Sequence, residues 1–399
     1  MANPRRKLRV AVLYGGRSGE HEISLISAAS VLRNLDPERF EAVPIAVDKD
    51  GRWHAGNAAA IDRAAKSLPV FRDLPPVLLP PSPSVSSEGE GGGATLMRYG
   101  GELAPAAALP TVDVVFPVMH GTLCEDGTIQ GFLELTELPY VGCGVLASAV
   151  GMDKEVAKRL CAAAGVPIVP YLSLRAGAWD PTSLPALVGE RLGYPCFVKP
   201  AGSGSSVGVH KVKRPEELVA AVEDAFRFDR KVLIEQAVGG LAGAREIEVA
   251  VLENPDPAGQ PLCSTVGEIN PRHEFYSYEA KYLDENGASL SIPAALDAGE
   301  LREAQRLAAA AFRALECEGL ARVDFFLEKP LPDDEKTGRR PALYFNEVNT
   351  LPGFTSISMY PKLWEASGVG YSELITRLIE LALKRHAQKK ALVRDFIRT

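Results

Sequence analysis

LYFNEVNTLPGFTSISM, residues 343–359, starts as an apolar, aromatic strand and breaks at a Pro-Gly turn. The two-residue alternation of a strand places Glu347 and Asn349 on one face. An ionised carboxylate is costly to bury unless it is paired or bound to a cation. Glu347 is therefore predicted to be either a salt-bridge partner or a metal ligand.

A second stretch, GLARVDFFL (residues 319–327), repeats this pattern, because Arg322 and Asp324 alternate with apolar residues. If the two strands pair, one face gathers Arg322 and Asp324 with Glu347 and Asn349. Hard oxygen ligands beside a cation suit a magnesium–phosphate site, and neither stretch offers thiolate or imidazole ligands. On these two stretches alone, an arginine–carboxylate network without a metal is an open alternative.

The composition is that of a soluble globular protein: 399 residues, enough for two or three domains, with a formal net charge of -7 and a pI near 5.6. No basic block occurs away from the termini, which argues against nucleic-acid or membrane-surface binding and favours small-molecule chemistry. The six cysteines lie far apart and form no metal-ligand or redox pair, so they are predicted to be reduced core residues. Neither a signal peptide nor a run of roughly 18 apolar residues occurs, so we expect a cytoplasmic protein.

Residues 8–35 predict a strand–turn–helix unit, with a strand at Leu8–Tyr14, a turn at Gly15-Gly16 and apolar residues at helical spacing after it. Ser18 is predicted to cap the helix, which would put Glu20 in its first turn, where exposed N–H groups favour an acid. The segment GGRSGE lacks the GxGxxG spacing, so a dinucleotide cofactor is not favoured.

A polar loop that contains His120, Glu125 and Asp126 follows the predicted strand Val112–Phe116. Open α/β sheets bind their ligands at the carboxyl ends of strands, so His120 is a site candidate. The alternative is a histidine that is only hydrogen-bonded within its loop. The excursion Pro75–Gly93, rich in Pro, Ser and Gly, is predicted to lie on the surface.

Further helices are predicted in the rest of the chain, among them Lys154–Ala164 with Asp153 as its cap, Asp297–Leu315, and the amphipathic helix Ser372–Arg385.

The loop PAGSGSSVGV, residues 200–209, lies between two predicted strands and lacks the GK[ST] of a P-loop, so it is predicted to be a mobile hairpin flap. Glycine turns present successive N–H groups, and serine hydroxyls with Lys199 add donors for a phosphate. The alternative is a plain flexible turn. Lys154 upstream and the acidic strand pair downstream favour the phosphate flap.

Residues 268–293 form a long irregular segment that is crowded with charged and aromatic side chains. Such segments within compact domains are often lids, and this one would bring Lys281 and Tyr282 to a substrate. A well-packed loop is the alternative.

Together these stretches resemble the ATP-grasp carboxylate-amine ligases, and within them the D-alanine:D-alanine ligases, over nearly the whole chain. Nine stretches match in order, which is far more specific than any one of them: GGRSGEHEIS, HGTLCEDGTIQG, GMDKEVAK, VKPAGSGSSVGV, VLIEQ, AREIEVAV, FYSYEAKY, ARVDFF and NEVNTLPGFTSISM. The resemblance implies an α/β and α+β protein, in which an ATP-grasp fold follows an N-terminal Rossmann-like (pre-ATP-grasp) domain. The implied parts are an α/β substrate domain (1–150), a central ATP-grasp lobe with the flap (151–238) and a C-terminal lobe (239–399).

The implied reaction is the ATP-dependent ligation of two D-alanine molecules for peptidoglycan precursor synthesis, through a D-alanyl phosphate and a tetrahedral intermediate. Both steps gather negative charge on oxygen atoms, so cations and fixed N–H donors would carry the catalysis. The resemblance implies two Mg²⁺ (or Mn²⁺) ions, held by Asp324, Glu347 and Asn349, with Glu347 bridging them.

The resemblance also implies which residues bind ATP. The phosphates would contact Lys154, Lys199, Lys281 and Ser206, the last within the flap Gly202–Gly208. Adenine and ribose would be held by Glu235, by the backbone after it at Gln236 and Val238, and by Glu246.

The implied substrate contacts come from four segments of the chain. Arg322 and the backbone N–H of Gly353 would stabilise the oxyanion of the tetrahedral intermediate. Glu20 would bind the ammonium group of the first D-alanine, with His120 near its carboxylate, and a hydrogen-bonded set of Glu20, Ser205 and Tyr282 would close the lid. Ser358 would bind the carboxylate of the second D-alanine, with Met359 beside its methyl group.

Two features depart from the family pattern. Cys124 stands where glycine is expected in the His120 loop, and the segment GGLAGAREIE between Glu235 and Glu246 is longer than usual.

Tyr282 favours D-alanyl-D-alanine over D-alanyl-D-lactate as the product. Another ATP-dependent amino-acid or peptide ligase and a catalytically silent nucleotide-binding protein are the alternative functions. The expected partners are D-alanine and a second copy in a homodimer, with no nucleic acid and no membrane.

Overall fold

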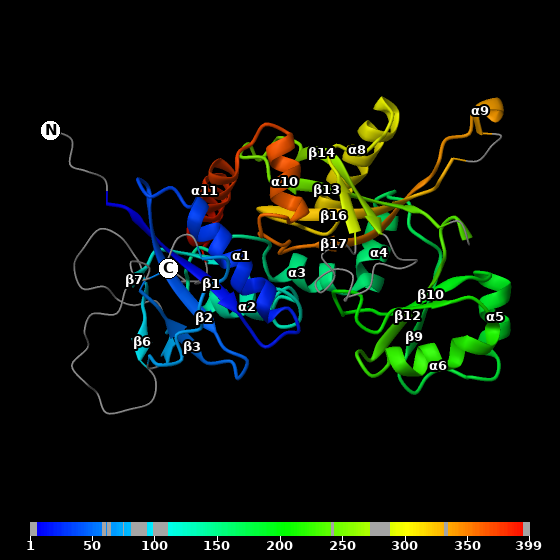
Figure 1. Cartoon of the computed structure of the whole chain (residues 1–399), viewed down its shortest axis with the longest axis horizontal. Coiled ribbons are helices and arrows are strands. Elements are labelled where there is room, and N and C mark those ends of the chain that lie inside the picture. The colour runs from blue at the N-terminus through cyan, green and yellow to red at the C-terminus, as the bar shows by residue number, and fades with distance from the viewer. Residues whose placement is uncertain are drawn as a thin grey trace, which may run out of the picture.

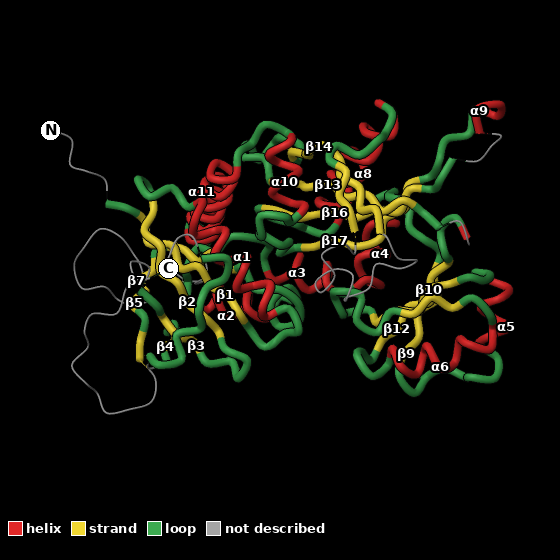
Figure 2. The backbone as a smooth tube through the Cα atoms, viewed as in Figure 1, coloured by secondary structure: helices red, strands yellow, loops and turns green. Residues whose placement is uncertain are grey.

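The structure is a computed structural model, and it describes residues 6–57, 61, 65–74, 76–80, 94–98, 111–240, 243–271, 288–330 and 334–393. Three groups of strands, each with its own helices, follow one another along the long axis of the molecule (Figure 1, Figure 2). The chain is thus a mixed α/β protein with several sheets. Within the described ranges, no helix has the length and apolar character that crossing a membrane requires.

The N-terminal sheet has six strands in the order β6-β4-β3-β2-β1-β8. They are β1 (Leu8–Gly15), β2 (Phe40–Val47), β3 (Trp53–Ala55), β4 (Val77–Leu78), β6 (Met97–Arg98) and β8 (Val114–Pro117), while β5 (Ala94–Thr95) pairs separately with β7 (Thr111–Val112). Its helices are α1 (His21–Asn34), α2 (Thr128–Leu135) and α3 (Val145–Met152). Because β1 pairs in parallel with both β2 and β8, the glycine turn after β1 and the His120 loop after β8 lie at one edge of the sheet.

Helix α1 begins later than the sequence predicted. Its N-cap residue is Glu20, whose side chain makes no capping hydrogen bond. The hydroxyl of Ser18 accepts from Glu20 N at 3.2 Å and donates to the carbonyl of His120 at 2.6 Å. The prediction that Ser18 caps the helix and that Glu20 lies in its first turn was therefore wrong, because Ser18 ties the glycine turn to the His120 loop instead.

The second sheet has four antiparallel strands in the order β11-β10-β12-β9. They are β9 (Tyr171–Arg175), β10 (Cys196–Pro200), β11 (His210–Val212) and β12 (Lys231–Gln236), with α5 (Leu184–Arg191) and α6 (Pro215–Ala225) packed on them. Since β10 and β11 are antiparallel neighbours, the Gly/Ser loop between them is a hairpin connection, as predicted.

Helix α4 (Lys154–Ala163) leads into the second sheet and starts where the sequence placed it. The carboxylate of Asp153 accepts from the N–H groups of Glu155 and Val156, each at 3.1 Å. This N-cap satisfies two of the helix's otherwise unpaired donors and confirms Asp153 as the predicted cap.

The third sheet has five antiparallel strands in the order β15-β14-β13-β16-β17. They are β13 (Arg245–Leu252), β14 (Leu262–Pro271), β15 (Ala288–Ser291), β16 (Leu320–Leu327) and β17 (Leu343–Asn349), accompanied by α8 (Ala298–Ala314), α9 (Asp334–Thr337) and α10 (Met359–Ala366). Alternate residues of β13 serve two cores: Val249 packs in the cluster that contains α8, and Ala250 packs in the cluster that contains α10.

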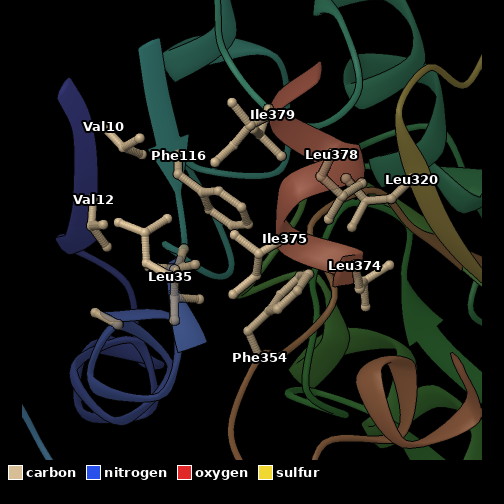
Figure 3. Close-up of a cluster of buried hydrophobic side chains, with 14 of the residues drawn as sticks. Val10, Val12, Leu35, Phe116, Leu320, Phe354, Leu374, Ile375, Leu378 and Ile379 are labelled. Atoms are coloured by element: carbon tan, nitrogen blue, oxygen red, sulfur yellow. The ribbon is translucent and has the colours of Figure 1, made fainter. Parts of the chain in front are cut away.

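The last helix, α11 (Tyr371–Lys390), returns to the N-terminal sheet and extends five residues beyond the predicted end of that helix at Arg385. Figure 3 shows Phe354, from the loop after β17, beside Phe116 of β8 and Ile375 of α11. The ring centroids of Phe354 and Phe116 are 5.6 Å apart in an edge-to-face arrangement. This contact holds the loop after β17 against the N-terminal sheet, so that segments from the two ends of the chain lie side by side.

Candidate active site

Strands β16 and β17 pair with each other, which meets the condition on which the expected polar face depends, and the pairing gathers their polar side chains. Asp324 lies opposite Glu347, and Arg322 lies opposite Asn349. The ladder shifts register directly after Asp324. Such bulges re-aim side chains and are frequent beside active sites, and this one adjoins the row of polar residues.

The guanidinium of Arg322 holds this row together. Its Nε and Nη2 atoms donate to the two oxygens of Asp324 at 2.8 and 2.7 Å, and Asn349 Nδ2 donates to Asp324 Oδ2 at 2.9 Å. Glu248 Oε2, from the neighbouring strand β13, lies 3.0 Å from Arg322 Nε. Burial disfavours the charged guanidinium, but Asp324 and Glu248 outweigh this effect and raise the pKa of Arg322 well above its usual value.

Glu248 is a member of this cluster that the sequence interpretation missed. It is 4% exposed and lies opposite Asp324 in the pairing of β13 with β16. The signal was present in the sequence, because Glu248 alternates with apolar residues in AREIEVAV. The same alternation singled out Asp324 in its own strand.

The donor chemistry of this face fits a divalent cation of the Mg²⁺ type. Asp324 and Glu347 offer carboxylate oxygens, and Asn349 offers an amide oxygen. Among the residues that the structure describes, no group of three or more His, Cys, Asp or Glu side chains is arranged to hold a metal by itself. Mg²⁺ usually takes one or two carboxylates and completes its shell with phosphate oxygens and water, so this face suits a metal that arrives with a nucleotide. The structure shows the arginine–carboxylate network, and the metal stays a prediction.

Lys154, the first residue of α4, joins the flap to strand β17. Its Nζ donates to the carbonyl of Ser203 at 2.8 Å and lies 3.1 Å from Glu347 Oε2. The side chain is only 10% exposed. A cation is thus held between the root of the flap and the predicted metal ligand, where a phosphate chain would need it.

Lys199, in β10, is held from two sides. Its Nζ lies 2.7 Å from Glu235 Oε2 and donates to Asn346 Oδ1 at 3.1 Å. Lys199 therefore connects the four-stranded sheet to β17 at the residue next to Glu347. Lys281, the third predicted phosphate ligand, lies outside the described residues.

The carboxylate of Glu235 points at two lysines. Besides Lys199, it contacts Lys158 of α4, whose Nζ lies 3.0 Å from Glu235 Oε1. Burial alone would raise the pKa of Glu235, but the two lysines hold it below its usual value. Burial lowers the pKa of Lys158, and the charge of Glu235 opposes that effect. A contact between residue 235 and adenine would therefore come from its backbone, because its side chain is committed to the lysines.

The other residues predicted to hold adenine and ribose lie near the connection between the second and third sheets. Gln236 ends β12, is exposed, and donates from its N–H to the carbonyl of Pro170 at 3.0 Å. Val238 follows it and is half-buried, while Glu246 is the second residue of β13. Their contacts with a nucleotide stay predictions.

The flap reaches the N-terminal part of the chain. Ser205 Oγ donates to Glu20 Oε1 at 2.5 Å, so the structure brings these two predicted site residues together. Ser205 and Ser206 have positive φ angles of 53° and 58°, an unusual conformation for residues with a side chain. Backbone strain of this kind is concentrated at ligand clamps and active sites. Tyr282, the third predicted member of the set, lies outside the described residues.

His120 is buried and held by three segments. Its Nε2 lies 3.1 Å from Ser27 Oγ of α1, and its Nδ1 lies 3.1 Å from the carbonyl of Leu351 after β17. Burial alone would lower the pKa of His120, but Glu125, with Oε1 at 3.7 Å, outweighs burial and raises it. His120 thus links the glycine turn and helix α1 to the loop after β17, and its contact with a substrate carboxylate stays a prediction.

The turn after β17 brings Gly353 and Ser358 together. A Cβ atom on Gly353 would lie 2.7 Å from Ser358 Oγ, so a larger residue would displace that hydroxyl. Ser358 Oγ also accepts from Thr355 N at 2.9 Å. Met359 is 5% exposed and packs beside Gly267, which gives it a core role. Its predicted contact with a substrate methyl group stays a prediction.

Cys124, the departure in the His120 loop, packs against the glycine turn. It is 2% exposed, and a Cβ atom on Gly16 would lie 3.4 Å from its Sγ. Its carbonyl accepts from Gln130 Nε2 at 2.8 Å. The thiol of Cys124 is therefore a buried core group under the loop. The polar side chains that the loop offers to a ligand belong to other residues.

Two family profiles match most of the chain. The profile described as D-ala D-ala ligase N-terminus matches residues 9–143, and the one described as D-ala D-ala ligase C-terminus matches residues 160–380. Among curated relatives, the chain is 53% identical over 395 residues to D-alanine--D-alanine ligase A of Bradyrhizobium diazoefficiens, covering 98% of this chain and 99% of the relative. It is 46% identical over 390 residues to D-alanine--D-alanine ligase A of Escherichia coli K12, covering 97% and 98% of the two chains.

Solved structures agree with these matches. The D-alanine-D-alanine ligase from Coxiella burnetii superposes with a TM-score of 0.77 at 33% identity, covering 96% of each chain. The VanG D-Ala:D-Ser ligase from Enterococcus faecalis superposes with a TM-score of 0.74 at 32% identity, covering 94% of this chain and 100% of the other. Proteins similar to this chain therefore include one ligase named for D-alanine and another named for D-serine as the second amino acid.

Proposed function

The chain belongs to the D-alanine–D-alanine ligase family, and we propose that it joins two D-alanine molecules at the expense of ATP by way of a D-alanyl phosphate. The observation that carries this proposal is that lysine ammonium groups lie close to the paired carboxylates of β16 and β17. Lys154 of α4 lies 3.1 Å from Glu347, which is paired with Asp324 of β16. Lys199 of β10 contacts Asn346, the residue next to Glu347. Cations beside a carboxylate pair are the parts that phosphoryl transfer from a metal-bound triphosphate requires.

We propose that the second and third sheets form an ATP-grasp fold. In this reading the central lobe is 151–238, the C-terminal lobe is 239–399, and residues 1–150 form a Rossmann-like substrate domain. Support comes from the parallel β2-β1-β8 core of the N-terminal sheet. It also comes from the contact between the two antiparallel sheets, in which Lys199 of β10, paired with Glu235 of its own sheet, donates a hydrogen bond to Asn346 of β17.

In the first step, a carboxylate oxygen of D-alanine would form a bond to the γ-phosphorus of ATP while the bond to the β–γ bridging oxygen breaks, releasing ADP. Lys154 and Lys199 would offset the negative charge of the phosphates, and the flap with Ser206 would cover them. Two Mg²⁺ or Mn²⁺ ions, held by Asp324, Glu347 and Asn349, would supply charge neutralisation and orient the triphosphate. Lys281 is proposed as a further phosphate contact.

In the second step, the amine nitrogen of the second D-alanine would form a bond to the carbonyl carbon of the acyl phosphate. The resulting tetrahedral oxyanion collapses, inorganic phosphate leaves, and the amine loses a proton. Arg322 and the N–H of Gly353 are proposed to stabilise the oxyanion, since fixed donors at developing charge act without reorganisation. The contacts of Arg322 with Asp324 and Glu248 hold its guanidinium in place for this role.

The two amino acids are proposed to lie between the flap and the loop after β17. Glu20 would bind the ammonium group of the first D-alanine, with His120 near its carboxylate, and Ser358 would bind the carboxylate of the second. The bond from Ser205 to Glu20 supports a flap that closes onto the first substrate. A homodimer and the assignments of Tyr282 and Met359 stay predictions from the family resemblance.

The proposed function is tested by identifying the products that the purified chain makes from ATP, Mg²⁺ and D-alanine. Mass spectrometry should show D-alanyl-D-alanine and ADP in equal amounts, with L-alanine as the negative control. D-serine as second substrate should react about 10- to 100-fold less efficiently, because an added hydroxyl changes binding in an apolar pocket by only this much. Preference for D-lactate over D-alanine near neutral pH would overturn the assignment.

Replacing Ser205 by alanine is expected to raise KM for D-alanine about tenfold while KM for ATP stays within about twofold. The substitution removes a partly exposed hydrogen bond to the carboxylate of Glu20, and such bonds to charged groups are worth about 1.5 kcal/mol at the low end. ADP release at varied D-alanine and varied ATP measures both constants. Ser206→Ala is the matched control on the same strained turn and should raise KM for ATP instead. Equal effects of both variants on the same constant would contradict this division of roles.

A further inference from the structure

Lys158 is fully buried, and the proposed reaction does not use it. We propose that Lys158 is a positioning residue for ATP binding, which fixes the carboxylate of Glu235 so that Glu235 in turn fixes the ammonium group of Lys199 at the phosphates. This inference rests on the proposed function, because it takes Lys199 to be a phosphate ligand. The matching stretch GMDKEVAK contains Lys158, but its helical spacing from Lys154 did not reveal a role.

The contacts of Lys158 lead from helix α4 to three other elements. Lys158 follows Lys154 by four positions, so both side chains lie on one face of α4. Lys158 Nζ lies 3.0 Å from Glu235 Oε1 of β12 and donates to the carbonyl of Phe345 in β17 at 3.3 Å. The other oxygen of Glu235 lies 2.7 Å from Lys199 of β10. One carboxylate is thus shared between two lysines, one oxygen to each.

This sharing restricts the position of Lys199. A carboxylate that is held through both oxygens cannot rotate without losing one of the two cations. Lys199 Nζ also donates to Asn346 Oδ1 at 3.1 Å. An ammonium group has three N–H donors, so when two are directed at Glu235 and Asn346 the direction of the third is set as well. Lys158 contacts the oxygen of Glu235 that Lys199 does not contact, and so completes the arrangement.

Lys158 also sets the charge of the group. With Lys158 protonated, Lys158, Glu235 and Lys199 together carry one net positive charge, whereas Lys199 and Glu235 without Lys158 are neutral as a pair. In a water-poor setting this difference acts strongly on a nearby triphosphate. All three side chains are at most 8% exposed, so solvent screens the charge poorly. A lysine with no exposed surface is costly to keep, which makes a role in the cluster the better explanation of its presence.

The test is Lys158→Met, which removes the charge and keeps a similar volume. We expect KM for ATP, and the Kd of ATP with Mg²⁺ measured calorimetrically without D-alanine, to rise about 10- to 100-fold, the size expected for losing a hydrogen bond to a charged group. KM for D-alanine should stay within about twofold. A purely structural role would instead lower the melting temperature and the active fraction, which reduces kcat and leaves both KM values unchanged.

Lys231→Met is the matched control. Lys231, in β12, is another poorly exposed lysine that contacts the start of α4, and its ammonium group pairs with Asp153 and Glu155 at 2.5 and 2.9 Å rather than with Glu235. Its loss should lower thermal stability while the Kd of ATP stays close to that of the unmodified chain. An equal rise in the Kd of ATP for both variants would overturn the proposal, because any lysine in this region would then have the same effect.

The double variant Lys158→Met/Glu235→Gln keeps the proposal testable if the single variant does not fold. It removes both buried charges together, and replacing a whole buried ion pair is usually tolerated where breaking it is not. If Lys158 acts through Glu235, the double variant and Glu235→Gln alone should raise the Kd of ATP equally. A double variant that binds ATP as tightly as the unmodified chain would overturn the proposal. Failure of the proposed function itself would look different, because the unmodified chain would then bind no ATP.

Discussion

Replacing Glu347 by glutamine is expected to reduce kcat/KM for ATP about 1000-fold at millimolar Mg²⁺, because a bound cation contributes several kcal/mol to stabilising the charge of phosphoryl transfer. The substitution keeps the size of the side chain and an oxygen that can accept from Lys154, now 3.1 Å away. It removes the charge that a divalent cation needs. The concentration of Mg²⁺ that gives half the maximal rate should rise together with the loss of activity.

Glu328→Gln is the control for Glu347→Gln. Glu328 follows β16 in the same sheet, its side chain is 20% exposed against 26% for Glu347, and it pairs with Arg339 rather than with a site residue. Its replacement should leave kcat/KM for ATP within about twofold. Steady-state ADP release and thermal unfolding of both variants separate the two effects. A Glu347→Gln variant with nearly full activity and an unchanged Mg²⁺ dependence would exclude Glu347 as a metal ligand.

The second large effect is expected for Arg322→Lys, which should lower kcat about 100- to 1000-fold, since one donor to an oxyanion contributes roughly 3–4 kcal/mol. Lysine keeps the positive charge near Asp324 and Glu248, so the buried carboxylates remain paired. It loses the planar fork that now donates to both oxygens of Asp324. The Kd of ATP should therefore change little while the rate of peptide-bond formation falls.

Arg245→Lys gives a close comparison for Arg322→Lys. Arg245, in β13 of the same sheet, makes a similar fork to Glu268 at 2.8 and 2.7 Å, and both arginine side chains are 19% exposed. The control should lose some thermal stability and keep kcat within about twofold. Single-turnover measurements with both D-alanine sites saturated would locate the affected step. If both variants lose kcat equally, the effect of Arg322 is on the fold of the sheet and not on the oxyanion.

Much of the fold could be predicted from short-range patterns. Asp153 caps α4 as predicted, because an N-cap is a bond within a single turn. Helix α8 spans Ala298–Ala314 with Asp297 as its cap, close to the predicted Asp297–Leu315. Ser18 failed as a cap because its hydroxyl donates to His120, a partner about a hundred positions away that no local pattern contains.

The site was predictable where its residues alternate with apolar neighbours in a strand. Arg322, Asp324, Glu347 and Asn349 were found in this way, and the structure places them on paired positions. Glu248 carries the same signal and was overlooked. Residues on helices and loops gave weaker signals. The sequence around a helical lysine such as Lys158 has the same pattern whether the side chain is exposed or fully buried.

The sequence by itself determined the kinds of elements, the family and the polar faces of β16 and β17, since alternation, capping and motif order are properties of neighbouring residues. Only the tertiary structure decided which charges meet. It directed the carboxylate of Glu235 to Lys158 and Lys199, set Lys154 between the flap and Glu347, and brought Ser205 to Glu20. These pairs join segments that are 36 to 193 positions apart, and their formation depends on how three sheets pack, which no local pattern encodes.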